Sequence, residues 1–118
     1  MNTIKIGIMS RKDFRQYTID IAKGKVKPFA DAPKVWFDSV ESMAQVLSSS
    51  NRELLNLIKT HHPQSLSELA EISGRRKESL SRTLRTMKDH GIVKLEKGKR
   101  NSTVPSVLAD SFEVAAFT

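Results

Sequence analysis

The chain has 118 residues, 38% of them hydrophobic, with 20 Lys and Arg against 13 Asp and Glu and no cysteine. This composition describes one small globular domain, leaves little room for a large enzyme, and excludes disulfide frameworks, thiolate metal sites and Cys nucleophiles. The formal net charge of +7 favours an anionic partner such as nucleic acid. No apolar run reaches the roughly 18 residues of a membrane span, and the first residues lack a signal-peptide pattern. We therefore expect a soluble, cytoplasmic protein with no membrane partner.

The N-terminal part of the chain predicts a strand, a helix and a linker. Alternating isoleucines have the period of a half-buried strand over residues 3–9. Ser10 is placed as an N-cap, and apolar residues at helical spacing predict an amphipathic helix over 11–23 with a basic outer face. The following KGKVKPFADAP, with two prolines, marks a linker. We expect residues 1–34 to form a strand-helix extension that serves dimerisation or contact with a partner.

The middle of the chain predicts three short helices. A cluster of apolar and aromatic residues at 35–37 precedes the first, and we expect Trp36 to be a core anchor. Ser50 and Ser65 each open a capping box, because a glutamate follows three residues later, and Gly74 ends the third helix. The three predicted helices cover residues 40–47, 51–61 and 66–73.

A fourth predicted helix spans residues 76–90 and ends at Gly91. Leu80, Leu84 and Met87 fall at i, i+4 and i+7, so they form one narrow apolar stripe on an otherwise polar helix. We expect this stripe to pack against the preceding helices and to leave the opposite side of the helix in solvent.

The rest of the chain predicts three strands. An apolar segment after the fourth helix begins a strand, KGKRN at 97–101 predicts a flexible hairpin turn, and residues 103–107 supply the return strand. A last strand is predicted over 112–117. The expected fold class is mainly α with a small β part (α+β), with a winged helix-turn-helix over 35–110 and a C-terminal strand or tail at 111–118.

The positive charge is concentrated in one part of the chain. Residues 74–100 hold ten Lys and Arg against three Asp and Glu, which gives this segment a charge of +7. Residues 11–27 hold six Lys and Arg against two Asp and Glu, and the remaining segments together cancel this second excess of positive charge. Because a helix of about 10–12 Å diameter fits the major groove, the fourth helix and the hairpin are the predicted surface for double-stranded DNA.

Side chains opposite the apolar stripe are the candidates for reading DNA bases. Arg82 is the strongest candidate, because a guanidinium can donate hydrogen bonds to O6 and N7 of the same guanine. The candidate base-reading residues are Glu78, Ser79, Arg82 and Thr86. The candidate phosphate contacts, which fix register without reading sequence, are Arg75, Arg76, Lys77, Arg85 and Lys88. The predicted wing tip, suited to a minor groove or phosphate strand, consists of Lys97, Gly98, Lys99 and Arg100.

Each of these patterns also has a plain structural interpretation. A charged helix face is usually only solvated, although a charge of +7 on one helix and hairpin argues against that here. The basic helix 11–23 is either a solvated or dimer-supporting surface or an auxiliary DNA contact. His61, His62 and His90 have capping or surface explanations, so we expect no metal site and no cofactor. No catalytic triad, phosphate loop or HExxH motif occurs, so we do not expect an enzyme.

The segment SLSELAEISGRRKESLSRTLRTMKDHGIVKLEKG resembles the winged helix-turn-helix of the MarR-like transcription regulators of bacteria and archaea. The likeness lies in the Ser-x-x-Glu-Leu-Ala opening, the glycine turn, Leu-Ser-Arg-Thr-Leu and Gly-Ile-Val-Lys-Leu. The upstream KVWFDSVESMAQVLSSSNRELLNLI is similar to a subgroup of small DNA-binding proteins that are often encoded beside a toxin. The resemblance implies a homodimeric repressor of its own operon and, in that subgroup, an antitoxin. The alternatives are an antitoxin that mainly neutralises its toxin directly, and a stand-alone regulator.

The sequence differs from the MarR pattern at two places, and each difference leads to an expectation about the structure. Arg76 stands where a Ser or Thr usually caps the recognition helix, so the helix start can shift by a residue or two. The long C-terminal dimerisation helix of larger MarR proteins is absent from this sequence. We therefore expect the strands at 3–9 and 111–117 to pair with each other, or across a two-fold axis with a second protomer.

Overall fold

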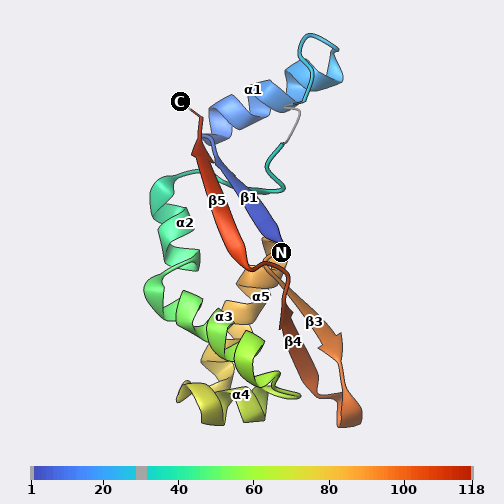
Figure 1. Cartoon of the computed structure of the whole chain (residues 1–118). Coiled ribbons are helices and arrows are strands. Elements are labelled where there is room, and N and C mark those ends of the chain that lie inside the picture. Colours follow the sequence, from blue (N-terminus) through green and yellow to red (C-terminus); the bar gives the residue numbers. More distant parts are fainter. Residues whose placement is uncertain (1, 29–31, 118) are drawn as a thin grey trace.

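The computed structural model describes residues 2–28 and 32–117 and shows an elongated molecule, with principal extents of 50 × 26 × 26 Å. The fold is of the α+β class, as predicted. Figure 1 shows a small sheet and helix α1 at one end, and a group of helices with a hairpin at the other. Among the residues that the structure describes, no helix combines the length and the apolar character needed to cross a bilayer.

The observed elements agree closely with the predicted ones. Each predicted helix matches an observed helix to within two residues at either end. In chain order the elements are β1 (Thr3–Ile8), α1 (Arg11–Ala22), β2 (Val35–Phe37), α2 (Val40–Val46), α3 (Ser49–His61), α4 (Leu66–Ser73), α5 (Lys77–Asp89), β3 (Val93–Lys97), the 3₁₀ turn η1 (Lys99–Asn101), β4 (Thr103–Val107) and β5 (Ser111–Ala116). Strand β2 was not predicted, because three residues are too few to show an alternating pattern.

A three-stranded parallel sheet of order β2-β1-β5 brings distant parts of the chain together. β5 runs beside β1 along its whole length, from Thr3 opposite Ser111 to Ile8 opposite Ala116. Of the two pairings predicted for the terminal strands, the structure therefore shows the one within a single chain. The sheet takes one strand from each of the three segments predicted along the sequence. Figure 1 shows β1 and β5, from the two ends of the described chain, side by side.

One face of this sheet contributes to a small core that faces α2. Ile6, Val35 and Phe37 are buried there, and Met43 of α2 packs against them. Phe112 of β5 packs against this core and also against the larger core among the helices. The sheet and the helices are therefore joined by continuous apolar packing.

The opposite face of the sheet carries an aromatic cluster around Trp36. Its ring lies over Gly7, where an added Cβ atom would come within 2.4 Å of the ring atom Cζ3. Phe14 and Tyr17 of α1 contact this ring at centroid distances of 5.1 and 6.3 Å. Phe117 contacts it at 5.7 Å. The expected core anchor is only half-buried: Trp36 attaches α1 to the sheet, and this close approach requires glycine beneath it.

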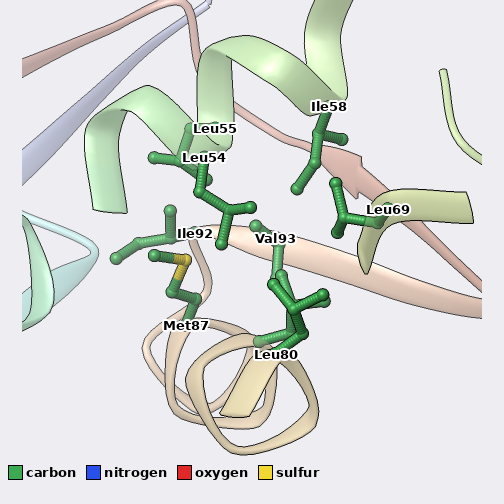
Figure 2. Packing of buried hydrophobic residues seen from close by; sticks show 9 residues of the cluster. Leu54, Leu55, Ile58, Leu69, Leu80, Met87, Ile92 and Val93 are labelled. Carbon is green, nitrogen blue, oxygen red and sulfur yellow. The ribbon is translucent and has the colours of Figure 1, made fainter. Parts of the chain in front are cut away.

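The larger core lies between α3, α4, α5 and β3, as Figure 2 shows. Leu80, Leu84 and Met87 have no exposed surface, so the predicted stripe of α5 is confirmed as its buried side. The other buried members are Leu54, Leu55, Ile58, Leu69, Ile92 and Val93. This packing sets the rotation of α5 about its axis and thereby decides which of its side chains face solvent.

Serine side chains start the helices α1 to α4, and one of the predicted caps is wrong. α3 is capped by Ser48, whose Oγ accepts a hydrogen bond from the backbone N–H of Asn51 at 3.2 Å. Ser50, the predicted cap, lies inside the first turn, where its hydroxyl accepts a bond from Arg75. The run of three serines offers several cap positions, and only the tertiary structure selects one. The predicted caps Ser10 and Ser65 are confirmed, and Ser39 caps α2.

Candidate nucleic-acid interface

Helix α5 presents opposite sides to the core and to solvent. Its apolar stripe is buried, while Glu78, Arg82 and Arg85 on the other side are exposed. Glu78 and Arg82 have the i, i+4 spacing that allows an intrahelical ion pair, yet the structure shows none. Within the described part of the chain, no charged side chain of α5 takes part in an ion pair. The cations of this helix are therefore available to a ligand outside the chain.

The four predicted base-reading residues are not equivalent in the structure. Glu78, Arg82 and Thr86 are exposed, whereas Ser79 is half-buried. The Thr86 hydroxyl donates to the carbonyl oxygen of Arg82 at 3.1 Å, so its hydrogen is already used within the helix. The Arg82 guanidinium makes no bond to another described residue. Arg82 is thus the member of this set best able to form a bidentate bond.

Arg82 stands at a shallow depression between α5 and the junction of α2 with α3. The walls of this depression also include Gln45 and Asn51, two amide side chains from outside α5. The Asn51 amide nitrogen donates to the carbonyl oxygen of Val46 at 3.0 Å, whereas Gln45 is exposed. Neither residue was predicted to belong to the site. They come from other helices, and nothing in their local sequence pattern marks them.

Arg75 makes contacts inside the chain that the sequence did not predict. Its guanidinium donates to the carbonyl and hydroxyl oxygens of Ser50 at 2.7 and 2.6 Å. It also donates to Asn51 Oδ1 at 3.0 Å. We expected Arg75 to contact a phosphate, but these three bonds tie the turn before α5 to the first turn of α3. Arg75 therefore helps to hold α5 in place, and its contact with a phosphate stays a prediction.

The N-terminus of α5 has no side-chain cap. Arg76 occupies the N-cap position, with φ −68° and ψ 143° and no capping hydrogen bond from its side chain. The helix therefore begins at Lys77, one residue later than predicted. The N–H groups of a first helical turn have no partner within the helix, and they carry partial positive charge. Together with the exposed side chains of Arg76 and Lys77, they make this end of α5 attractive to an anion.

Three hydrogen bonds close the tip of the β3–β4 hairpin. Gly98 N donates to the carbonyl oxygen of Ser102 at 2.8 Å, and Ser102 N donates to that of Lys99 at 3.1 Å. The Ser102 hydroxyl donates to the carbonyl oxygen of Gln64 at 3.0 Å, which ties the tip to the loop between α3 and α4. The tip is a bonded 3₁₀ turn in which Arg100 has φ 57°.

Gly98 is required by the geometry of this tip. A Cβ atom at that position would lie 2.6 Å from Val104 Cγ2, well inside van der Waals contact. Lys97, Lys99 and Arg100 are exposed around the turn. The three predicted wing cations are thus carried on a backbone whose shape is set by hydrogen bonds.

The second basic segment lies far from this tip. Helix α1, which carries the exposed Lys12, is at the opposite end of the molecule in Figure 1. Arg11 Nε donates to Asp38 Oδ2 at 3.3 Å, and Ser42 donates to Asp38 Oδ1 at 2.8 Å. The bond from Ser42, with a smaller contribution from the charge of Arg11, lowers the pKa of Asp38 below its usual value of 3.8.

His62 and His90 have separate surroundings. His62 is the C-cap of α3, with φ 48°. His90 stacks on Phe37 with a centroid distance of 4.4 Å and an interplanar angle of 25°. Among residues 2–28 and 32–117, no group of three or more His, Asp or Glu side chains is placed to hold a metal ion.

A protein-family model matches the region that contains this candidate interface. It is the model of the HVO_A0114 family, and it matches residues 46–114, more than half of the chain. The matched region runs from the end of α2 into β5 and includes all of α5 and the hairpin. No curated protein and no solved structure matches the chain.

Proposed function

The chain belongs to the HVO_A0114 family, and we propose that it is a winged helix-turn-helix regulator that binds double-stranded DNA. In this proposal α3, α4 and α5 are the helices of the motif, and the β3–β4 hairpin is the wing. α5 enters the major groove, and the wing lies against the neighbouring phosphate strand or minor groove. The resemblance to MarR-like regulators and the order of these elements both support the proposal.

One observation carries this proposal: α5 is fully buried along its apolar stripe and has unpaired cations on its opposite side. Residues 74–100 hold a charge of +7, which the alternative of a merely solvated helix does not account for. Buried packing prevents α5 from rotating, so its exposed side chains have one fixed direction. A helix about 10–12 Å wide then fits a major groove about 12 Å wide.

The exposed residues of α5 divide into base-reading and positioning groups. Arg82 is the proposed base-reading residue, because it is exposed, unpaired and opposite the buried stripe. Glu78 reaches the groove from the first turn. The phosphate contacts in this proposal are Arg76, Lys77, Arg85 and Lys88. Arg75 belongs to neither group, since its bonds to α3 place it inside the protein framework.

The closed wing tip supports a second point of contact with DNA. Lys97, Lys99 and Arg100 extend from a turn whose backbone is already bonded, so little conformational entropy is lost when they bind a phosphate. Because such contacts carry no sequence information, they raise the affinity for all DNA sequences alike.

The test compares two alanine variants on two duplexes, the DNA upstream of the protein's own coding sequence and a random sequence of equal length. Arg82→Ala is expected to weaken binding to the upstream duplex by about 1–3 kcal/mol and to relax base preference. Lys99→Ala is expected to weaken both duplexes similarly and to lower the salt slope by about 1. Lys12→Ala removes one cation from the distant α1 for comparison: unchanged affinities would exclude α1 as an auxiliary DNA contact, and an equal loss on both duplexes would support that contact.

Two outcomes would contradict this assignment. If each variant loses as much affinity for the random duplex as for the upstream duplex, Arg82 does not read bases. If the unaltered protein shifts neither duplex at low salt, the chain is not a DNA-binding protein of this kind. Footprinting on the upstream duplex would locate the contacted bases directly.

The resemblance further implies autoregulation and a toxin partner, and a genetic test separates these from a stand-alone regulator. A small toxin gene beside the coding sequence, and growth rescue on co-expression, would support neutralisation. Deleting residues 1–34 is unsuitable for this test, because it removes β1, the central strand of the sheet. Substitutions at exposed positions of α1, such as Arg15→Glu, keep the sheet intact and test that surface.

A further inference from the structure

Strand β5 leaves one edge of the parallel sheet open. It occupies the outer position beside β1, and within the described residues no strand pairs with its other edge. Natural sheets usually protect such edges with lysine, proline or a bulge. The segment from Ser111 to Ala116 has none of these, and Glu113 is its only charged residue. An edge of this composition is suited to pairing with another strand.

Hydrogen bonds already made to β1 show which backbone groups face outward. Phe117 N donates to the carbonyl oxygen of Ile8 at 2.8 Å, and Ser111 N is directed to that of Asn2. In a parallel pair, alternate residues of a strand bond to the same neighbour. The odd-numbered residues of β5 therefore face β1. The N–H and C=O groups of Phe112, Val114 and Ala116 point away from the sheet.

We propose that a second copy of this chain pairs with this edge, antiparallel and across a two-fold axis at Val114. The three outward-facing residues are symmetric about the central one. In this register Val114 lies opposite Val114 of the second copy, and Phe112 lies opposite its Ala116. Three such pairs, each exchanging two N–H···O bonds, give about six hydrogen bonds. No other antiparallel register uses all three outward-facing residues.

The side chains and the charge of this segment also favour a second copy of the chain as the partner of the β5 edge. Val114 is 50% exposed, and an antiparallel pair would bring its side chain against its own copy. Each Glu113 would face an alanine, so the two carboxylates do not oppose each other. Residues 101–118 have two acidic and no basic side chains. Two molecules of net charge +7 therefore meet with less repulsion through this segment than through the basic α5, hairpin or α1.

This inference goes beyond the proposed function and does not depend on it. The pairing would form a six-stranded sheet with two copies of α5 related by a two-fold axis. If the chain binds DNA, such a dimer would read two symmetric half-sites. Because association is measured without DNA, failure of the dimer and failure of DNA binding give separate results.

The absence of cysteine makes a direct test available. Val114→Cys would place two thiols in a symmetric hydrogen-bonded pair with Cα atoms about 5.5 Å apart, within the range that a disulfide spans. Val40→Cys is the matched control, because Val40 on α2 is 51% exposed and lies outside the edge. Ala116→Cys tests the register, since its two copies would be about 13 Å apart, four residues along the strands.

The measurements are the mass of the unaltered protein in solution at micromolar concentration and the rate of crosslinking under mild oxidation. We expect twice the mass of one chain, and crosslinking of Val114→Cys on the order of 100-fold faster than that of Val40→Cys. Ala116→Cys should crosslink no faster than the control. A monomeric mass would overturn the proposal, as would a dimer in which Val114→Cys crosslinks no faster than Val40→Cys.

Discussion

The contact between Arg75 and α3 gives the sharpest prediction, because the two roles considered for Arg75 have opposite consequences. As a phosphate contact, Arg75 would affect DNA binding and leave folding unchanged. As the link to Ser50 and Asn51 that the structure shows, it would affect folding and leave the number of phosphate contacts unchanged. Arg75→Ala therefore separates the two.

The expected loss of stability follows from the three hydrogen bonds that the substitution removes. Each is worth about 0.5–1.5 kcal/mol net, and bonds from a charged donor lie at the upper end or above. Because Arg75 is only half-buried, water replaces part of what is lost. We expect the free energy of unfolding to fall by about 1–2 kcal/mol. For a domain of this size, the melting temperature should drop by about 4–8 °C.

The assay combines thermal unfolding with DNA binding at several salt concentrations. Arg76→Ala is the matched control, because Arg76 is adjacent, exposed and without a side-chain capping bond. We expect Arg76→Ala to lower the slope of log affinity against log salt by about 0.9 and to leave the melting temperature unchanged. Arg75→Ala should show the reverse. A lowered salt slope with an unchanged melting temperature in Arg75→Ala would refute the structural role.

Three further predictions concern the sheet, the hairpin and α2. Gly7→Ala should destabilise the fold by about 1–3 kcal/mol, because the added methyl group clashes with the ring of Trp36. The substitution should also shift the fluorescence of Trp36, the single tryptophan, and unchanged emission would contradict this packing. Gly98→Ala should open the wing tip and weaken binding to all DNA sequences alike, as a gel-shift titration would show. Because the lowered pKa of Asp38 stabilises the fold above its usual value of 3.8, this contribution is lost as the pH falls through the folded value. Ser42→Ala should raise the pKa of Asp38 in a carboxyl NMR titration. An unchanged titration midpoint would show that the Ser42 hydroxyl does not cause the lowered pKa.

The features that the sequence predicted correctly depend on neighbouring residues. The stripe of Leu80, Leu84 and Met87 follows from helical periodicity, and its burial is complete. Ser65 caps α4, and Gly74 ends that helix with φ 72°, a conformation that glycine adopts without strain. Such signals extend over one or two helical turns, and periodicity and capping rules capture them.

The features that the sequence did not predict depend on residues brought together by the fold. Arg75 bonds to Ser50, 25 positions earlier, and this contact links the turn before α5 to the first turn of α3. The tip of the β3–β4 hairpin bonds through Ser102 to the carbonyl oxygen of Gln64, 38 positions away. β2 is a strand because β1 lies beside it, not because of its own three residues. No local pattern contains this information.

The pairing of β1 with β5 has a consequence for the order of folding during synthesis. The backbone N–H of Asn2 bonds to the carboxylate of Asp110, 108 positions later, whereas the helical core is assembled from Leu54 to Val93. Short-range contacts form first, because long loops are slow to close. β1 therefore leaves the ribosome early, and the side of it that β5 later covers stays open until β5 is made. During that interval β1 exposes an unpaired strand edge, and such edges make incompletely folded chains prone to aggregate.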